Sequence, residues 1–174
     1  YGAPSSEPAN SVGMPRSKWY MHLGDEAALI LASLPGVLVF KNADRIAAAN
    51  DAIQNHGCTV LILDDGYQYT PLARDENILV IDASNPFGNG RLLPRGTLRE
   101  PVSAITRATE IMLTRCDQAK DLNETLARLR QVAPETPIRQ TTHAPVDVVH
   151  IASGERKPLE WLRGQSMTVA CGIG

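Results

Sequence analysis

The apolar residues of this 174-residue chain fall into short runs that alternate with amphipathic segments. The clearest run, Thr-Val-Leu-Ile-Leu at residues 59–63, lacks polar alternation and predicts a strand covered on both faces of a parallel sheet. Further strands are expected at residues 37–40, 78–82, 110–113, 146–151 and 167–170. Helices are expected at residues 27–34, 44–55, 102–107 and 121–132. Residues 1–18 carry Gly, Ser, Pro and Asn without periodicity and are expected to form a loop.

This alternation of strands and helices predicts an α/β fold, with a mostly parallel sheet flanked by helices. The chain is long enough for one domain, so we expect a single domain over residues 1–174. The chain begins at Tyr1 without Met and ends in a strand-like run into Gly174, with nothing after it. We therefore expect it to be a segment of a longer polypeptide.

Charge and cysteine content exclude several classes of protein. The net charge of −2 provides no general attraction for nucleic acid or for an anionic membrane, and no nucleic-acid partner is expected. No apolar stretch approaches the roughly 18 residues of a membrane span. The cysteines, Cys58, Cys116 and Cys171, are widely spaced and form no metal-binding motif, so we expect buried, reduced thiols and a reducing compartment.

Two adjacent carboxylates, Asp64 and Asp65, follow the apolar run and precede Gly66. Ligands of open α/β sheets bind at the carboxyl ends of the strands. An apolar strand followed by such acids is typical of a Walker-B-type Mg²⁺ site in phosphoryl transfer. Neighbouring carboxylates raise each other's pKa unless a cation compensates, which favours this interpretation. A strand that ends in an ordinary polar turn remains the structural alternative.

Two other groups of charged residues are candidates for function. Asp25 and Glu26 open the first long helix, where Asp25 can cap the helix and Glu26 suits its positive end. The Pro- and Gly-rich segment at residues 85–101 carries Arg91, Arg95 and Arg99, which suits an anion-binding loop. A good helix start and a solvated basic loop are the respective structural alternatives.

Several motifs resemble those of one enzyme family. Residues 64–69, Asp-Asp-Gly-Tyr-Gln-Tyr, resemble DDGFQH, residues 24–27 resemble GDEP, and residues 89–101 resemble the GNG…LPAGPLREP segment. Tyr1-Gly2 resembles the end of SRGYG, and residues 170–174 resemble the start of GIGNP. The chain thus resembles the tetraacyldisaccharide 4'-kinases of lipid A biosynthesis from its first residue to its last, in the family's order.

The resemblance implies a P-loop-kinase-like core in an enzyme that uses ATP and Mg²⁺ as cofactors. Such kinases phosphorylate the 4'-hydroxyl of an acylated glucosamine disaccharide 1-phosphate, peripherally, at the cytoplasmic face of the bacterial inner membrane. Membrane contact is expected through parts outside this chain. Phosphoryl transfer depends mainly on positioning and charge neutralisation, to which carboxylates, Mg²⁺ and arginine are suited.

The resemblance also assigns roles to individual residues. Asp64 and Asp65 would hold Mg²⁺, directly or through water. Asp25 would help to activate the sugar hydroxyl with support from Glu26, and Gln68 would orient groups around the phosphate. The remaining residues would bind substrate or phosphate: Arg45 and Arg99, which match family arginines, and Arg95, which adds a charge to the loop.

The chain departs from the family pattern at several points. No GxxxxGK[ST] motif occurs in it, and the four histidines match no catalytic motif. In the family the phosphate loop precedes the SRGYG motif and the catalytic His follows GIGNP, so we expect both outside a chain truncated at both ends. Residues 1–174 alone are therefore expected to have no measurable turnover. Tyr69 replaces the His of DDGFQH and cannot become a cation near pH 7.

Two alternatives stay open on the residues. A binding or scaffold domain with a decayed kinase site would carry a structural Asp-Asp-Gly turn. A different P-loop enzyme with another acceptor would share the same Mg²⁺-site residues, because no residue here recognises acyl chains by itself.

Overall fold

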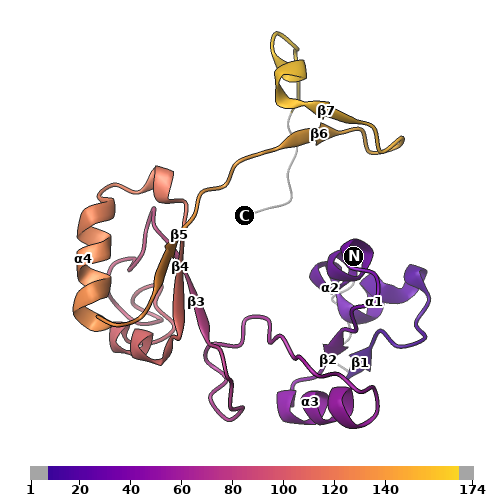
Figure 1. Ribbon diagram of the computed structural model, residues 1–174, viewed down its shortest axis with the longest axis horizontal. Helices are drawn as coiled ribbons and strands as arrows, with labels where there is room; N and C mark the ends of the chain where they lie inside the picture. The colour runs from indigo at the N-terminus through magenta and orange to yellow at the C-terminus, as the bar shows by residue number, and fades with distance from the viewer. Residues whose placement is uncertain (1–7, 169–174) are drawn as a thin grey trace. The chain divides into compact units, whose positions relative to one another are not determined.

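The structure is a computed structural model that describes residues 8–168 of the chain. It divides into two compact units, Tyr1–Asp75 and Glu76–Gly174, which the colour bar of Figure 1 distinguishes by residue number. The single domain expected over residues 1–174 stays a prediction. None of the helices within residues 8–168 is long and apolar enough to cross a bilayer.

The first unit is mainly helical. A 3₁₀ turn η1 (Arg16–Lys18) leads into α1 (Trp19–Leu23), followed by α2 (Asp25–Ser33) and α3 (Arg45–Gln54). The start of α3 follows from one residue: the Asp44 carboxylate accepts hydrogen bonds from the backbone N–H groups of Ile46 and Ala47, both at 3.0 Å. These bonds satisfy two of the donors that every helix start leaves unpaired. Helices predicted at residues 27–34 and 44–55 are therefore confirmed.

A small antiparallel sheet joins the segment before η1 to the segment between α2 and α3. Strand β1 (Ala9–Asn10) pairs with β2 (Phe40–Lys41). The predicted strand at residues 37–40 overlaps β2 only at Phe40, and the loop predicted at residues 1–18 contains β1 and η1. The indole N–H of Trp19 donates to the Met14 carbonyl at 3.1 Å, which ties this segment to α1.

The apolar run at residues 59–63 is not a strand in this structure. It has no regular secondary structure, and its side chains face solvent, with Val60 76% and Ile62 93% exposed. The prediction of a buried parallel strand there is wrong. A parallel strand needs a neighbouring strand for its backbone groups and cover for both faces. No strand among residues 8–168 pairs with this run.

The second unit contains the main sheet. Strands β3 (Ile78–Asp82), β4 (Glu110–Thr114) and β5 (Ile138–Gln140) are parallel and lie in that order. The register pairs Leu79 with Ile111, and Ile111 with Ile138. An ion pair between Arg139 Nε and Glu110 Oε1 at 2.6 Å joins β4 to β5. The predicted strands at residues 78–82 and 110–113 are confirmed, while β5 was not predicted.

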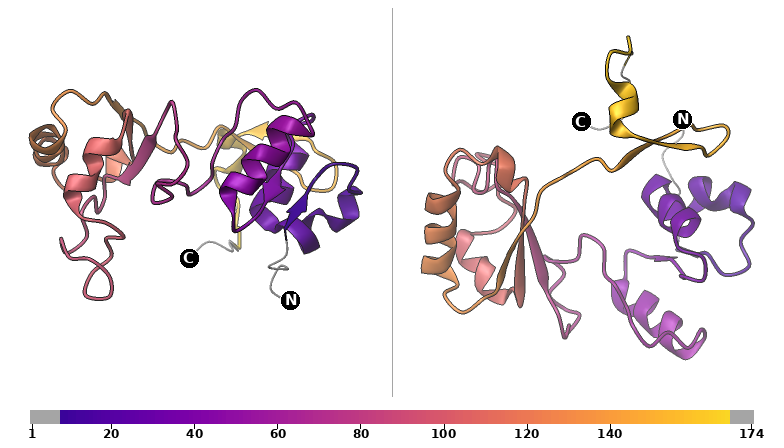
Figure 2. Two further views of the ribbon diagram at one scale, coloured as in Figure 1. Left: turned by 90° about the horizontal axis from the view of Figure 1, so that it is seen from below. Right: turned by 45° about the horizontal axis from the view of Figure 1, so that its top comes forward.

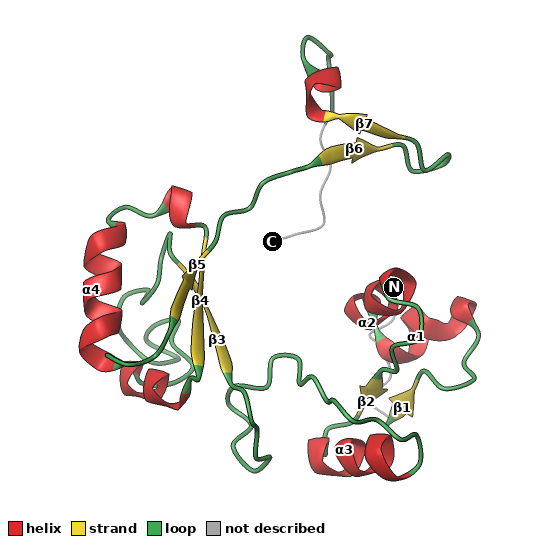
Figure 3. Ribbon diagram, in the orientation of Figure 1, coloured by secondary structure: helices red, strands yellow, loops and turns green. Residues whose placement is uncertain are grey.

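The core of the second unit lies between this sheet and α4 (Leu122–Val132), which Figures 1 and 3 show alongside the strands. Ile111 and Leu113 of β4 and Leu129 of α4 are completely buried. Asp121 caps α4 by accepting from the Glu124 N–H at 2.9 Å. Short 3₁₀ segments, η2 (Val102–Arg107) and η3 (Cys116–Gln118), precede and follow β4. The amphipathic helix predicted at residues 121–132 is confirmed, and residues 102–107 form a 3₁₀ helix.

The second unit has an α/β arrangement, as predicted, although its parallel sheet is smaller than expected. Successive residues of β3 point to opposite faces of the sheet and differ in burial: Ile81 is buried, whereas Val80 is 60% exposed. The other two sheets within residues 8–168 are two-stranded and antiparallel, so the parallel arrangement is limited to β3, β4 and β5.

A β-hairpin follows the main sheet, as the two views of Figure 2 also show. Strand β6 (Asp147–Val149) pairs antiparallel with β7 (Arg156–Pro158), and a 3₁₀ turn η4 (Leu159–Leu162) follows. The strand predicted at residues 146–151 is thus confirmed in its central part. The turn at Ser153-Gly154 is confirmed, with Gly154 at φ +72°. Of the strand predicted at residues 167–170, Met167 and Thr168 are irregular, and the rest lies outside the described residues.

Candidate functional site

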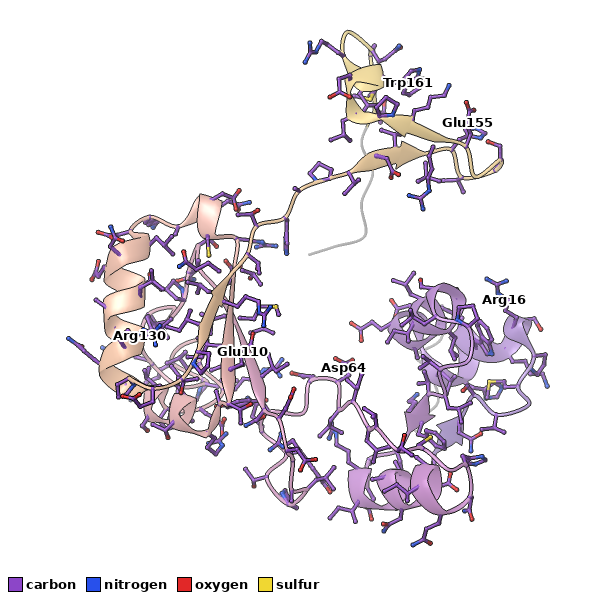
Figure 4. The ribbon with its side chains drawn as sticks, viewed as in Figure 1. Arg16, Asp64, Glu110, Arg130, Glu155 and Trp161 are labelled. Carbon is purple, nitrogen blue, oxygen red and sulfur yellow. The ribbon has the colours of Figure 1, made fainter. Side chains whose placement is uncertain are left out.

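The acidic motif at residues 64–69 forms a turn within the irregular segment of the first unit, where Figure 4 labels Asp64. The Asp64 and Asp65 side chains are both exposed, and Asp65 has a left-handed backbone with φ +45°. The next residue, Gly66, is buried, and a Cβ there would clash with the Leu63 side chain. A larger residue at this position would therefore require the Leu63 side chain to move, and the turn presents the two carboxylates to solvent.

Hydrogen bonds hold the rest of this turn. The Tyr69 N–H donates to the Gly66 carbonyl at 2.9 Å, and the Thr70 N–H donates to the Gln68 carbonyl at 3.0 Å. The Arg74 guanidinium donates to the same Gly66 carbonyl at 2.6 Å. These bonds fix the backbone directly after the carboxylates, whereas the Gln68 side chain is exposed and accessible to a ligand.

One contact joins the turn to a helix. The Arg45 guanidinium carbon lies 5.2 Å from the centre of the Tyr69 ring, within the range of a cation–π interaction. Arg45 is the first residue of α3, directly after the cap Asp44. The structure thus brings together two parts of the predicted site that are 19 residues apart in sequence, Arg45 and the turn that carries Asp64 and Asp65.

Asp25 and Glu26 occupy the first turn of α2 in the same unit, and both side chains are exposed. The N-cap is Gly24, so the prediction that Asp25 caps this helix is wrong. Gly24 has φ +100°, a conformation that favours glycine and leaves Asp25 inside the helix. Two acidic residues in the first turn still suit the positive end of a helix, as predicted for Glu26.

The predicted arginines Arg95 and Arg99 belong to the second unit. They lie, with Arg91, on a loop that follows β3, and all three residues are exposed. Backbone hydrogen bonds from Leu93 to Leu98 and from Leu98 to Arg91, at 3.0 and 3.2 Å, close this loop on itself. The structure therefore confirms an exposed basic loop, and its use as an anion site stays a prediction.

The predicted Mg²⁺ ligands form a pair of carboxylates. Within residues 8–168 no group of three or more His, Cys, Asp or Glu side chains is placed to hold a metal ion. Mg²⁺ is commonly bound by one or two carboxylates together with water and substrate phosphates. The oxygen donors of Asp64 and Asp65 therefore fit the type of ligand that Mg²⁺ takes.

Sequence reasoning missed an acidic residue that does end a strand in the structure. Asp82 ends β3, and its carboxylate accepts from the Ser84 hydroxyl at 2.7 Å and from the Arg115 guanidinium at 2.9 Å. The Ser84 hydrogen bonds, with the Arg115 charge, lower the pKa of Asp82 below its ordinary value. The signal was in the sequence, because an acid at the carboxyl end of an apolar strand is the same pattern that singled out Asp64.

The cysteines are only partly as expected. Cys58 and Cys116 are free thiols, in agreement with the prediction, but each is half-buried rather than fully buried. The Cys116 thiol donates to the Leu113 carbonyl at 3.2 Å. Cys171 and the motif residues at positions 1–2 and 170–174 lie outside the described residues.

The second unit is thus of the α/β class, with a three-stranded parallel sheet and the helix α4, and the first unit separately carries a solvent-facing carboxylate turn beside an arginine. A family model described as tetraacyldisaccharide-1-P 4'-kinase matches residues 1–174. The chain therefore belongs to the tetraacyldisaccharide-1-P 4'-kinase family.

Curated relatives carry the same name. The chain is 44% identical over 153 residues to the tetraacyldisaccharide 4'-kinase of Anaeromyxobacter sp. (strain Fw109-5), which covers 86% of this chain and 41% of that protein. It is 35% identical over 184 residues to that of Syntrophus aciditrophicus (strain SB), which covers 100% of this chain and 49% of that protein. It is 38% identical over 150 residues to that of Geobacter sulfurreducens, and the alignment covers 86% of this chain and 40% of that protein.

The chain thus spans two fifths to one half of the length of these relatives. No solved structure matches it.

Proposed function

We propose that this chain is part of an ATP-dependent kinase that phosphorylates the 4'-hydroxyl of an acylated glucosamine disaccharide 1-phosphate in lipid A biosynthesis. The observation that carries the proposal is the solvent-facing Asp64-Asp65 turn, joined to the start of α3 through Arg45 and Tyr69. The names of the relatives, tetraacyldisaccharide 4'-kinase, support the same activity. They give no support to the scaffold alternative.

Asp64 and Asp65 are proposed to hold Mg²⁺, directly or through water. When bound, the ion supplies positive charge to the phosphate oxygens during transfer. The chain's contribution is to present two carboxylates on a backbone fixed by Gly66 and Arg74. The exposed Gln68 amide, two residues beyond Gly66, is proposed to orient groups around the phosphate.

Asp25 is proposed to accept the proton of the sugar hydroxyl as its oxygen bonds to the γ-phosphorus of ATP. The bond between that phosphorus and the bridging oxygen breaks, and ADP leaves with the electron pair. Asp25 and Glu26 are exposed at the start of α2 and accessible to a substrate. Glu26 is proposed to support Asp25 as a second negative charge.

Arginines are proposed to bind the anionic groups of the substrates. Arg45 is the best supported, because its position is set by the helix cap Asp44 and by the Tyr69 ring. Arg95 and Arg99 stand on the basic loop after β3. Each guanidinium keeps its charge at any physiological pH and presents several N–H donors to a phosphate.

The proposal includes a P-loop-kinase-like core and a peripheral location at the cytoplasmic face of the bacterial inner membrane. This chain contains no GxxxxGK[ST] motif, so the proposal places the nucleotide cradle outside residues 1–174. The location follows from the proposed substrate, whose acyl chains belong in a bilayer.

The test is phosphate transfer from labelled ATP to the acylated disaccharide 1-phosphate, measured on a polypeptide of the relatives' length that contains this chain. Removal of a group that takes part in proton transfer typically lowers the rate by about 10²- to 10⁴-fold. We therefore expect such a loss in Asp25→Ala. Asp64→Ala should also lose activity, because it removes a proposed Mg²⁺ ligand.

Asp117→Ala is the matched control, because Asp117 is an exposed acidic residue of the second unit and is not one of the predicted site residues. Full activity in Asp25→Ala or Asp64→Ala would contradict the assigned roles. MgATP-dependent transfer by residues 1–174 alone would contradict the placement of the nucleotide cradle.

A further inference from the structure

The loop after β3 ends in an apolar tip between two arginines. Residues 91–95, Arg-Leu-Leu-Pro-Arg, are all exposed, with Leu92 44% and Leu93 63% exposed. We call these five residues the leucine tip. Two neighbouring leucines held in solvent are unfavourable unless they have a partner, because each gives up the free energy of burial.

The leucine tip is held in place by its own backbone. The N–H groups of Arg95 and Gly96 both donate to the Leu92 carbonyl at 3.0 Å, and the Asn89 side-chain amide donates to the Arg95 carbonyl at 2.9 Å. A Cβ at Gly96 would clash with the Arg91 carbonyl, so the chain folds back closely at this point. The two leucines are therefore exposed on a loop whose backbone is fixed by its own hydrogen bonds.

The same loop is anchored in the core of the second unit. Phe87 is buried, and the Arg128 guanidinium of α4 lies 4.1 Å from the centre of its ring. The Gly90 N–H donates to the Phe87 carbonyl at 2.8 Å, directly before the tip. The leucine tip thus projects from a fixed base and needs little ordering to bind a surface.

The charged residues of the loop itself are all of one sign. Between Asp82 and Glu100 the sequence contains three arginines and no acidic residue. Apolar side chains beside Lys or Arg are typical of elements that lie in the interface of an anionic bilayer, with the cations at the phosphates and the apolar groups at the acyl boundary. We propose that the leucine tip docks on the surface of an anionic phospholipid bilayer, as a local contact in addition to the one expected through parts outside this chain.

Other exposed apolar segments lack this combination. Val60 and Ile62 are more exposed than the leucines, but Asp64 and Asp65 follow them, and an anionic surface repels those charges. The segment at residues 16–21 of the first unit is basic and aromatic. There, however, the Trp19 indole donates to Met14 and the Arg16 guanidinium lies over the Trp19 ring.

This proposal does not depend on the kinase activity, and vesicle flotation of the chain tests it directly. We expect binding to phosphatidylcholine vesicles that contain phosphatidylglycerol, and weaker binding to phosphatidylcholine alone or at high salt. The double variant Leu92→Ser/Leu93→Ser should weaken binding by at least about tenfold. Arg91→Gln should weaken it by roughly fivefold, and only on the anionic vesicles.

The matched control is Ile151→Ser/Arg163→Gln, which removes an exposed apolar residue and an exposed cation from the region of the hairpin. It should leave vesicle binding unchanged. Circular dichroism checks that each variant is folded, which is expected because every substituted side chain is exposed.

Equal binding by the wild type and Leu92→Ser/Leu93→Ser would overturn the proposal. Loss of binding in Tyr20→Ser/Met21→Ser but not in the tip variant would place the contact in the first unit and would equally overturn it.

Discussion

The two units of the chain differ in how many buried side chains and how many predicted site residues they contain. The second unit buries most of the core residues of the described chain, among them Ile111, Leu113 and Leu129. The first unit carries most of the predicted catalytic and metal-binding residues but buries few large side chains, such as Leu23 and Leu31. Residues that act on a ligand must face solvent, which agrees with the smaller number of buried side chains in the unit that holds most of the predicted site residues.

The same difference separates two apolar strand-like runs. Residues 78–82 became β3 because β4 supplies a partner strand and α4 belongs to the same packed core. Residues 59–63 are at least as apolar, yet Ile62 is 93% exposed. An apolar run therefore defines a strand only where other elements are present to pair with it and cover it.

The largest effect should come from the core of the second unit. Leu129→Ala removes a completely buried side chain and should lower the free energy of unfolding by about 2–5 kcal/mol. Leu29→Ala, at a position 68% exposed in the first unit, should change it by less than about 0.5 kcal/mol. Urea unfolding measures both values. Equal losses would show that the contrast in burial between the units is false.

The helix caps should give an intermediate effect in both units. Asp44→Ala and Asp121→Ala each remove a carboxylate that accepts from backbone N–H groups, at a cost of about 1 kcal/mol. Asp44 accepts two such bonds and Asp121 accepts one, so we expect the larger loss at Asp44. Hydrogen exchange of the amides of α3 and α4 reports each helix separately.

Asn50→Ala, at an exposed position inside α3, is the control, because alanine favours a helix interior. Its α3 amides should be protected at least as well as in the wild type. Unchanged protection of α3 in Asp44→Ala would contradict the role of this cap.

The successful predictions rest on local signals. Asp44 and Asp121 mark the starts of α3 and α4, and the spacing of Leu122, Leu126 and Leu129 marks the buried face of α4. Such signals lie within a few residues of each other, so the sequence displays them.

The predictions that failed depend on distant partners. Strand β5 is short and polar, and it is fixed by pairing with β4 and by the contact between Arg139 and Glu110, 29 positions apart. That hydrogen bond also lowers the pKa of Glu110. No local pattern encodes such a contact. The acidic turn was found from its pattern, whereas the position of Arg45 beside Tyr69 required the structure.

A smaller effect is expected at the contact between Tyr69 and Arg45 in the first unit. Tyr69→Ala removes the ring beneath Arg45, and cation–π contacts at exposed sites contribute about 0.5–1 kcal/mol. This corresponds to a rise of roughly two- to fivefold in KM for the disaccharide 1-phosphate, with little change in kcat. Tyr69→Phe keeps the aromatic face and should resemble the wild type.

Both Tyr69 variants are measured in the transfer assay on the longer polypeptide. A loss of kcat in Tyr69→Phe would contradict a positioning role and would indicate that the hydroxyl itself takes part in the reaction.

The smallest effect should come from Asp82 at the end of β3. Its pKa is lowered by Ser84 and Arg115 in the folded chain, so ionisation of this carboxyl stabilises the fold above the ordinary pKa of an aspartate, about 4. That contribution is lost as the pH falls through the lowered pKa. The ion pair with Arg115 is solvent-exposed on both sides, so the contribution should stay below about 1 kcal/mol.

Asp82→Asn should therefore be less stable than the wild type at neutral pH, and the difference should shrink as the pH falls below about 4. Urea unfolding at a series of pH values measures this difference. A constant difference between Asp82→Asn and the wild type at all pH values would show that the carboxylate charge contributes nothing, and that only the shape of the side chain matters at this strand end.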